Sequence, residues 1–331
     1  MSELRQLIAR LPGARRFYRA VRYAPLVQRL STPLPNREAG NIFFHYNSLF
    51  DAEAVIRRHA VPGLGGRGGY VTNFLGVLIE PRFFPAILAQ RVGEVEALPI
   101  PANWHADIAE WAAALRAVDL ARGSFTMLEL GCGWGCWMCN TGVAARRAGL
   151  AIRLAGIEAD AGHIAFAEAA RVANGFSPDA FRVLRGVASA AEGIALFPRD
   201  PRPGHSWGSR PVFGASNQAR QKAAAGGRFD EVPMIGLPGL LSTCSRLDLL
   251  HMDIQGGEAD LIEACLEPLG EKVAYLVIGT HSREIEGRLF ARLRASGWRL
   301  EIERPAILTL GRRGPSVTVD GLQGWRNRRL R

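Results

Sequence analysis

The chain has 331 residues, of which 48% are hydrophobic and 22% are charged. This composition is ordinary for a globular protein, and it argues against a disordered or membrane-embedded chain. The net charge of +10 by itself favours an anionic partner such as nucleic acid or an acidic membrane. Only two of the 41 basic residues are lysine, however, and arginine excess beside abundant alanine and glycine is typical of a GC-rich genome. We therefore draw no functional prediction from the charge.

The cysteines and the first residues bear on the compartment. There are five cysteines, an odd number, and three of them fall within eight residues, which does not indicate a disulfide framework. Residues 1–10 lack the apolar core of a secretory signal. No run approaches the roughly 20 apolar residues that span a bilayer. We expect a cytoplasmic protein with reduced thiols.

Residues 1–100 are predicted to form an N-terminal extension, mostly helical and irregular. Within residues 1–30, leucine and isoleucine recur at helical spacing around Pro12–Gly13, and five arginines follow between residues 15 and 29. This basic segment is expected to lie on a solvated face, with peripheral contact to the inner face of a membrane as the alternative. Residues 31–100 mix proline, glycine and aromatic residues, which predicts loops and short elements.

Regular alternation of strands and helices begins after a predicted amphipathic helix at 102–120. Strands are expected at 125–130, 151–157, 181–184, 247–254, 273–278 and 298–303. A seventh strand, at either 307–310 or 316–319, is expected to close the sheet as an antiparallel end. This pattern predicts an α/β domain over 101–331 with a doubly wound, mainly parallel, seven-stranded sheet.

A segment at about 198–240, rich in proline, glycine and arginine, interrupts this alternation. Insertions of this length inside a compact domain are usually functional or mobile. Trp207 within it is a candidate wall of a substrate pocket, with a mobile loop as the alternative.

A glycine-rich loop, Gly131–Gly135, follows the first long strand and precedes a helix. Glycine lets the backbone pass close to a bound molecule, and a helix N-terminus supplies free N–H groups. Glu129 stands two residues before the first glycine, where it can accept a hydrogen bond from the ammonium group of S-adenosylmethionine (SAM). A dinucleotide loop has little use for an acid there, because it must cradle a pyrophosphate. The predicted SAM-binding residues of this loop are Glu129, Gly131, Cys132, Gly133 and Trp134.

A second acid, Glu158, ends the next expected strand, where a carboxylate can accept both ribose hydroxyls of an adenosine. Glu158 and Glu129 are separated by one strand–helix crossover, and this pair is the strongest evidence in the sequence for SAM binding. Ala159 beside it is predicted to bind the cofactor too. Val187, just past the third strand, is predicted to face the adenine, with an ordinary loop as the alternative.

The fourth strand ends in Asp253-Ile-Gln-Gly-Gly-Glu258, and the fifth ends in Ile278-Gly-Thr-His281. With these motifs the sequence resembles the FkbM family of SAM-dependent methyltransferases, which carries an Ile-Asp-Val-Glu-Gly-x-Glu motif after the fourth strand. Gln255 stands where the family has its first glutamate. The resemblance covers residues 100–305. It implies a Rossmann-like methyltransferase sheet and O-methylation of a hydroxyl on a sugar, glycan or polyketide-like small molecule.

Asp253 and His281 are the predicted catalytic residues, because they end neighbouring strands at the edge where open α/β sheets bind ligands. A hydroxyl nucleophile benefits from a general base, and we expect one of the two to take or orient its proton. Asp253 is also expected near the SAM sulfonium. An unperturbed histidine has a pKa of about 6.5, so His281 can titrate near working pH. His251 is expected to be structural.

Three other functions stay open. Cys132, Cys136 and Cys139 have the spacing by which radical SAM enzymes hold an iron–sulfur cluster. A cluster there would occupy the cofactor's place, so we expect three buried thiols instead. A nucleic-acid methyltransferase is disfavoured, because the fourth strand lacks an Asn/Asp-Pro-Pro-aromatic motif, and no nucleic-acid partner is expected. A non-catalytic SAM-fold scaffold is the third alternative, and the scattered histidines predict no metal site.

Overall fold

The computed structural model describes residues 41–312 and 314–330. The chain divides into two units, residues 1–44 and 45–331. Of the first unit, the short 3-10 helix η1 (Ile42–Phe44) is described, whereas the basic helix predicted within residues 1–30 lies outside the described residues. No helix in the described part of the chain is long and apolar enough to cross a membrane.

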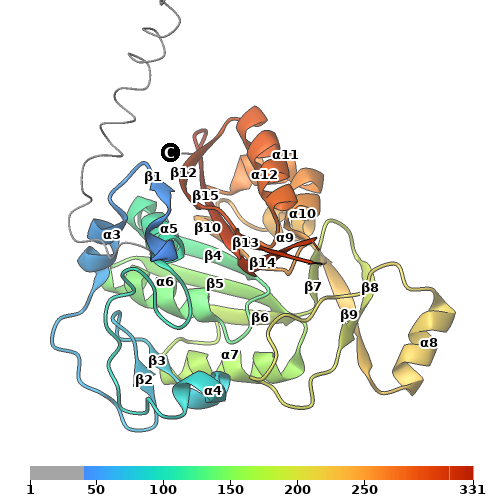
Figure 1. Ribbon diagram of the computed structural model, residues 1–331, viewed down its shortest axis with the longest axis horizontal. Helices are drawn as coiled ribbons and strands as arrows, with labels where there is room; N and C mark the ends of the chain where they lie inside the picture. The colour runs from blue at the N-terminus through green and yellow to red at the C-terminus, as the bar shows by residue number, and fades with distance from the viewer. Residues whose placement is uncertain (1–40, 313, 331) are drawn as a thin grey trace, which may run out of the picture. The chain divides into compact units, whose positions relative to one another are not determined.

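A large, mostly parallel sheet forms the centre of the second unit (Figure 1). It has eight strands in the order β1-β12-β15-β11-β10-β4-β5-β6. Their bounds are β1 (Asn47–Ser48), β4 (Ser124–Leu130), β5 (Ala151–Glu158), β6 (Phe181–Arg185), β10 (Leu249–Met252), β11 (Tyr275–Thr280), β12 (Trp298–Arg304) and β15 (Gly321–Asn327). The strand order reverses between β4 and β10, which places a topological switch point beside the glycine-rich loop. The predicted α/β sheet is confirmed, with one strand more than expected because β1 extends the edge at β12.

The strand that closes the sheet is not one of the two that we predicted. Those segments form β13 (Ile307–Gly311) and β14 (Gly314–Val319), which pair with each other as a separate hairpin and are largely exposed. β15 instead runs antiparallel between β11 and β12, and its residues are almost all buried. Its sequence, GLQGWRN, lacks β-branched residues, so strand propensity does not reveal it. Glycine is needed at Gly324, where a Cβ would come within 2.6 Å of the Ile302 side chain.

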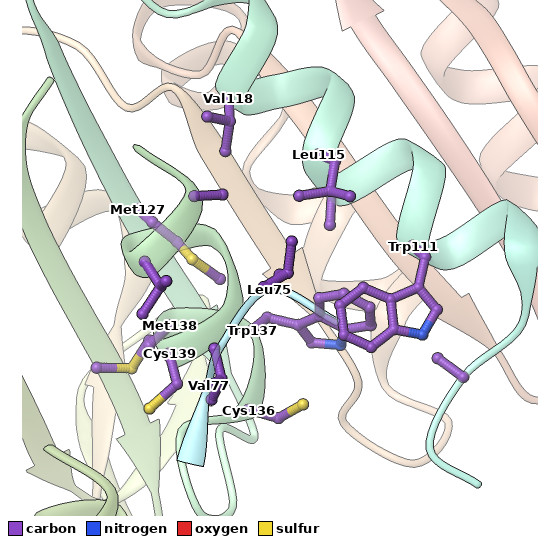
Figure 2. Close-up of a cluster of buried hydrophobic side chains, with 14 of the residues drawn as sticks. Leu75, Val77, Trp111, Leu115, Val118, Met127, Cys136, Trp137, Met138 and Cys139 are labelled. Carbon is purple, nitrogen blue, oxygen red and sulfur yellow. The ribbon is translucent and has the colours of Figure 1, made fainter. Parts of the chain in front are cut away.

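Helices cover both faces of the sheet. One hydrophobic cluster involves α3 (Ala52–His59), α5 (Ile108–Leu120), α6 (Cys136–Arg147) and α7 (Ala161–Ala173). The other involves α9 (Leu237–Ser242), α10 (Glu258–Ala264), α11 (Leu266–Lys272) and α12 (Arg283–Ala295). Neighbouring strand residues point to opposite faces, and Met127 accordingly joins the first cluster while Leu128 joins the second. Figure 2 shows the first cluster, where Trp111 of α5 lies against Trp137 of α6.

Helix α5 begins later than the sequence predicted. Asp107 caps it, because its side chain accepts hydrogen bonds from the amides of Ala109 and Glu110. The preceding residues 102–106 therefore remain irregular. Residues 45–100 contain only short elements besides α3, as expected: β1, β2 (Val71–Thr72), β3 (Leu78–Ile79), η2 (Pro81–Phe83) and α4 (Pro85–Leu88).

A second, smaller sheet stands beside the first (Figure 1). Its strands are β7 (Val187–Ser189), β9 (Phe229–Gly236) and β8 (Gly193–Pro198), in that order, and α8 (Asn217–Ala225) precedes β9. A small core of its own includes Val187, Ala195 and Val232. The predicted insertion at 198–240 therefore contains regular structure and completes a separate sheet.

Candidate active site

A cavity of about 700 Å³ opens where β4, β5 and β10 end. This volume is within the usual range for small-molecule sites. The walls come from the glycine-rich loop, the end of β5, the start of β7, the loop after β10, and the segment 207–213. Six of the predicted site residues line this one space: Gly131, Gly133, Glu158, Ala159, Val187 and Asp253.

The other predicted residues lie behind the cavity wall. Cys132 and Trp134 are both 2% exposed and pack in the first hydrophobic cluster. His281 is buried beside Asp253 and does not form part of the wall. Glu129 is also buried, and its surroundings are described next.

Glu129 faces the start of helix α6. Its Oε1 accepts a hydrogen bond from the Trp137 amide at 3.2 Å, and its Oε2 accepts one from the Met138 amide at 2.9 Å. Amides in the first turn of a helix lack helical partners, and negative charge is favourable there. Burial raises the pKa of Glu129 to about 7. In this structure the acid fastens α6 to β4, and its contact with the cofactor ammonium stays a prediction.

Glu158, in contrast, faces the cavity. Its Oε2 accepts a hydrogen bond from the Gly133 amide at 2.8 Å, while its Oε1 accepts from the amides of Ala159 and Asp160, both at 2.8 Å. The carboxylate therefore joins the glycine-rich loop to the end of β5. Two carboxylate oxygens offer about four lone-pair sites, so capacity remains for a hydroxyl group of a ligand.

Two glycines of the loop allow close packing around it. Gly131 has φ +73°, and a Cβ there would come within 2.2 Å of the Asp253 carbonyl oxygen. Gly133 has φ +53°, and a Cβ there would come within 2.7 Å of the Trp207 ring. Any side chain at either position would be strained and would push apart the walls of the cavity.

Trp207 forms the centre of an aromatic stack on the cavity wall. Its ring centroid lies 4.0 Å from that of His163, nearly parallel at 2°, and 4.4 Å from that of Phe84 at 10°. The Nε2 atom of His163, which is buried, has no hydrogen-bond partner among the described residues. The three rings come from α7, the residue before α4 and the segment between β8 and α8. Long-range stacking of this kind leaves no pattern in the sequence.

A chain of three charged side chains lies beside the cavity, after β10 and β11. His281 Nε2 lies 3.2 Å from Asp253 Oδ1, and His281 Nδ1 lies 3.0 Å from Glu258 Oε1. Burial lowers the pKa of His281, but its interactions with the two carboxylates outweigh burial and raise the pKa to about 10. His281 is therefore protonated and a hydrogen-bond donor at neutral pH. This differs from the titration near neutral pH expected from the sequence.

The charge of Asp253 follows from the same contacts. Burial raises its pKa, but hydrogen bonding and attraction to His281 outweigh burial, and the net result is a pKa below the usual value. Glu258 belongs to the motif after the fourth strand, but no role was predicted for it. Its spacing, three residues after Gln255 and at the first position of a helix, was the available signal.

Asp253, Glu258 and His281 offer three ligand atoms within 4.8 Å of one another. The two nitrogens of the ring face different carboxylates, however. A single metal ion therefore cannot replace both contacts without moving the ring.

A second group of polar side chains lies within the first hydrophobic cluster, among aromatic rings. His105 Nε2 is 2.6 Å from Cys136 Sγ, and burial together with nearby His251 lowers the pKa of His105 to about 4. His251 Nε2 is 3.0 Å from Glu110 Oε1, and its ring stacks on Trp137. These contacts agree with the structural role expected for His251.

The three closely spaced cysteines are buried, as expected. Burial raises the pKa of each thiol well above its usual value. Figure 2 shows Cys136 and Cys139 among the apolar side chains of the first cluster. They pack as small hydrophobic residues.

Comparison with known proteins was made on sequence and on structure. No family model matches the chain. A protein of Jannaschia sp. (strain CCS1) named "Putative methyltransferase" is 45% identical over 267 residues, which cover 81% of this chain and 95% of the relative.

Solved structures were also compared. The C-terminal domain of precorrin-6Y C5,15-methyltransferase from Rhodobacter capsulatus has 15% identity and a TM-score of 0.38, covering 68% of this chain and 92% of that chain. The precorrin-6y C5,15-methyltransferase of Geobacter metallireducens GS-15 has 9% identity and a TM-score of 0.37, covering 65% and 85%. Because the Jannaschia relative is similar over most of both chains, the chain described here belongs to the same methyltransferase family.

Proposed function

We propose that this protein is a SAM-dependent O-methyltransferase of the FkbM type, acting on a hydroxyl of a sugar, glycan or polyketide-like small molecule. The observation that carries the proposal is the cavity at the strand ends, where Gly133, Glu158 and Asp253 face one space. Open α/β sheets bind ligands at this edge. Membership of a methyltransferase family supports the type of reaction.

The cavity residues fit the cofactor. Glu158 already accepts three backbone hydrogen bonds, which leaves about one lone-pair site for a ribose hydroxyl. The buried Nε2 of His163, which has no hydrogen-bond partner among the described residues, offers a further polar contact. Ala159 and Val187 supply the apolar surface that an adenine requires. Trp207 lies directly over Gly133 and limits the entry of water. When bound, SAM supplies an electrophilic methyl group.

Asp253 is the proton acceptor in this proposal. Its side chain is 47% exposed and lines the cavity, and its contact with His281 favours the ionised form. An ionised carboxylate can orient an acceptor hydroxyl and take its proton as the oxygen–methyl bond forms. The proton then passes to solvent. His281 donates to Asp253 and acts through it.

A small acceptor fits best, because the cavity of about 700 Å³ must hold both the cofactor and the acceptor. The segment 207–213 forms one wall and contributes Pro211 and Phe213. We propose that this wall selects the acceptor. A cytoplasmic location, the absence of a nucleic-acid partner, and membrane contact by residues 1–30 stay predictions.

Two isosteric variants test the cofactor site. Replacement of Glu158 by glutamine removes a charged acceptor from the cavity wall. We expect S-adenosylhomocysteine affinity, measured by calorimetry, to fall about tenfold to a hundredfold, since hydrogen bonds to charged groups contribute about 1.5–3 kcal/mol. Glu168→Gln is the matched control, because that carboxylate pairs with Arg171 on α7 and does not line the cavity. A wild-type protein that binds neither SAM nor its product would refute the proposal.

Methyl transfer is then measured with radiolabelled SAM and a panel of hydroxylated sugars and polyketides. We expect labelled product with at least one acceptor class. Cofactor binding without transfer to any acceptor would favour the scaffold alternative.

A further inference from the structure

We propose that Glu258 is a positioning residue of the active site, which holds His281 as an imidazolium against Asp253. The inference rests on the proposed function, because Asp253 is the proton acceptor there. It assigns a role to a side chain that does not touch the reacting atoms and acts through His281 and Asp253.

The three side chains form a path from the protein interior to the cavity. The exposed fractions are 0% for Glu258, 8% for His281 and 47% for Asp253. A neutral imidazole carries one N–H and one lone pair. Since both ring nitrogens lie within 3.2 Å of a carboxylate oxygen, a neutral ring would point its lone pair at one of them. A doubly protonated ring makes both contacts favourable ion pairs. The contact at Nδ1 is an ion pair by distance and not a hydrogen bond, since Nδ1 has no hydrogen-bond partner among the described residues.

The backbone fixes Glu258 in place. Its Oε1 accepts hydrogen bonds from the amides of Ile254 at 3.1 Å and Gly256 at 3.0 Å. Its Oε2 is buried without a hydrogen-bond partner among the described residues. A nearby positive charge stabilises a buried carboxylate in its ionised form, and His281 Nδ1 lies 3.0 Å from Oε1. Glu258 therefore fixes both the position and the charge of the imidazole.

The effect reaches the cavity through one oxygen of Asp253. His281 Nε2 and Gln255 Nε2 both lie against Oδ1, at 3.2 Å and 3.0 Å. Gln255 has φ +62°, a left-handed conformation that is uncommon for a residue with a side chain. Donors on one oxygen orient the carboxylate and leave Oδ2 for a ligand.

Other charged groups face this cluster. Asp320, before β15, interacts electrostatically with His281, Asp253 and Glu258, and Arg304 partly offsets it. His251, on β10, interacts with Asp253. Without the charge of Glu258, Asp253 and Asp320 would still favour the imidazolium. The expected change is therefore a lower titration point for His281 and not a loss of titration.

Glu258→Gln tests the inference, because it keeps an acceptor oxygen for the two amides and removes the charge. Glu263→Gln is the matched control on the same helix, since Glu263 pairs with Arg288 and Arg292 instead. Protonation is read by NMR on protein with ¹⁵N-labelled histidine, and His281→Asn assigns the signal. We expect His281 to stay doubly protonated between pH 6 and 9 in the wild type and in Glu263→Gln. In Glu258→Gln the proton concentration at the titration midpoint of His281 should rise at least tenfold. This places the midpoint within that pH range.

The rate of methyl transfer gives a second readout. With an active acceptor, kcat of Glu258→Gln relative to that of the wild type should fall at least tenfold as the pH rises from 6 to 9. KM for SAM should stay within threefold. A merely structural role would lower activity equally at every pH.

Three results would overturn the inference: a neutral His281 in the wild type at pH 7.5, an unchanged titration in Glu258→Gln, or broadening of the His281 signal by equimolar Mn²⁺, which would assign the cluster to a cation. If Glu258→Gln does not fold, Glu258→Asp is measured in its place, because its shorter side chain withdraws the carboxylate from His281 Nδ1 and should lower the titration of His281 in the same direction. Because NMR needs no turnover, failure here is distinguishable from failure to bind SAM.

Discussion

His105 and His281 are both partly buried histidines, yet one is neutral and the other is positively charged at neutral pH. His105 lies against the Cys136 thiol and several aromatic rings, and burial lowers its pKa to about 4. His281 lies between two carboxylates, which overcome burial and raise its pKa to about 10. Burial alone therefore does not set the charge of a histidine. The neighbouring groups do.

The two surroundings also differ in their relation to the cavity. The chain from Glu258 to Asp253 ends in a half-exposed carboxylate on the cavity wall. The region around His105 is sealed by Trp111, Trp134 and Trp137. We infer that the charged region serves the reaction, whereas the aromatic region holds the sheet and α6 together.

The largest effect is expected at the exposed end of the charged region. Asp253→Asn keeps the shape of the side chain and removes the proton acceptor, so kcat should fall by about a hundredfold or more. Affinity for S-adenosylhomocysteine should change much less, because Glu158 is intact. Steady-state rates and calorimetry on the same preparation measure both. Activity within threefold of the wild type would remove Asp253 from the mechanism.

A smaller effect is expected for the aromatic stack on the cavity wall. Trp207→Ala removes a ring that stacks on His163 and Phe84, and an aromatic pair contributes about 0.5–1.5 kcal/mol beyond its buried area. We expect S-adenosylhomocysteine affinity to fall about tenfold. Phe213→Ala is the comparison, because Phe213 also lines the cavity but is 49% exposed. Equal losses in both variants would argue against a specific role for the stack.

The different charge states predict opposite dependence of stability on pH. His105 titrates near 4 when folded and near 6.5 when unfolded. The unfolded chain therefore binds more protons in this interval, and the free energy of unfolding should fall as pH decreases through it. The contribution of His281 is fully present below about 6.5 and is lost as pH rises towards 10.

Urea unfolding between pH 4.5 and 9.5 measures both slopes. His105→Asn should flatten the acid side, and His281→Asn should flatten the alkaline side. An acid slope that persists unchanged in His105→Asn would mean that another group controls it.

The smallest signal concerns the thiols of the sealed region. Cys132, Cys136 and Cys139 are buried with raised pKa values, whereas Cys244 is partly exposed. An aromatic disulfide reagent should therefore modify about one thiol in the native protein and all five after denaturation. Rapid reaction of several native thiols, or iron bound after anaerobic reconstitution, would instead support an iron–sulfur cluster on these cysteines.

Much of the fold can be predicted from apolar runs and their spacing. The five parallel strands of the central sheet are short and rich in apolar residues, and glycine-rich or acidic turns follow several of them. They are β4, β5, β6, β10 and β11. β15 was missed because it contains two glycines and no β-branched residue, and packing alone makes it a strand. β1 was missed because two residues carry no periodicity.

The site was predictable where a backbone motif carries it. Glycine loops and acids at strand ends have fixed places in this topology, so Gly133, Glu158 and Asp253 could be expected at one edge of the sheet, and they line one cavity. Their roles in binding and catalysis stay predictions. The direction of Glu129 was not predictable, because a carboxylate at that position can face either the ligand or the helix amides. Trp207 was a candidate pocket wall in the sequence and lines the cavity. Its stacking on His163 and Phe84, and the role of Glu258, depend on contacts between distant segments, which a single sequence does not show.

The smaller sheet has a consequence for how this protein can change over evolution. Its three strands share no ladder with the central sheet, and their small core meets the end of β5 through Ala159. The segment 207–213, between two of these strands, supplies one wall of the cavity. Apart from Trp207, which stacks on His163 of α7, residues of this segment can change and reshape the wall while the strands that carry Glu158 and Asp253 stay as they are. Relatives can therefore diversify in this appendage while the catalytic scaffold stays under separate constraint.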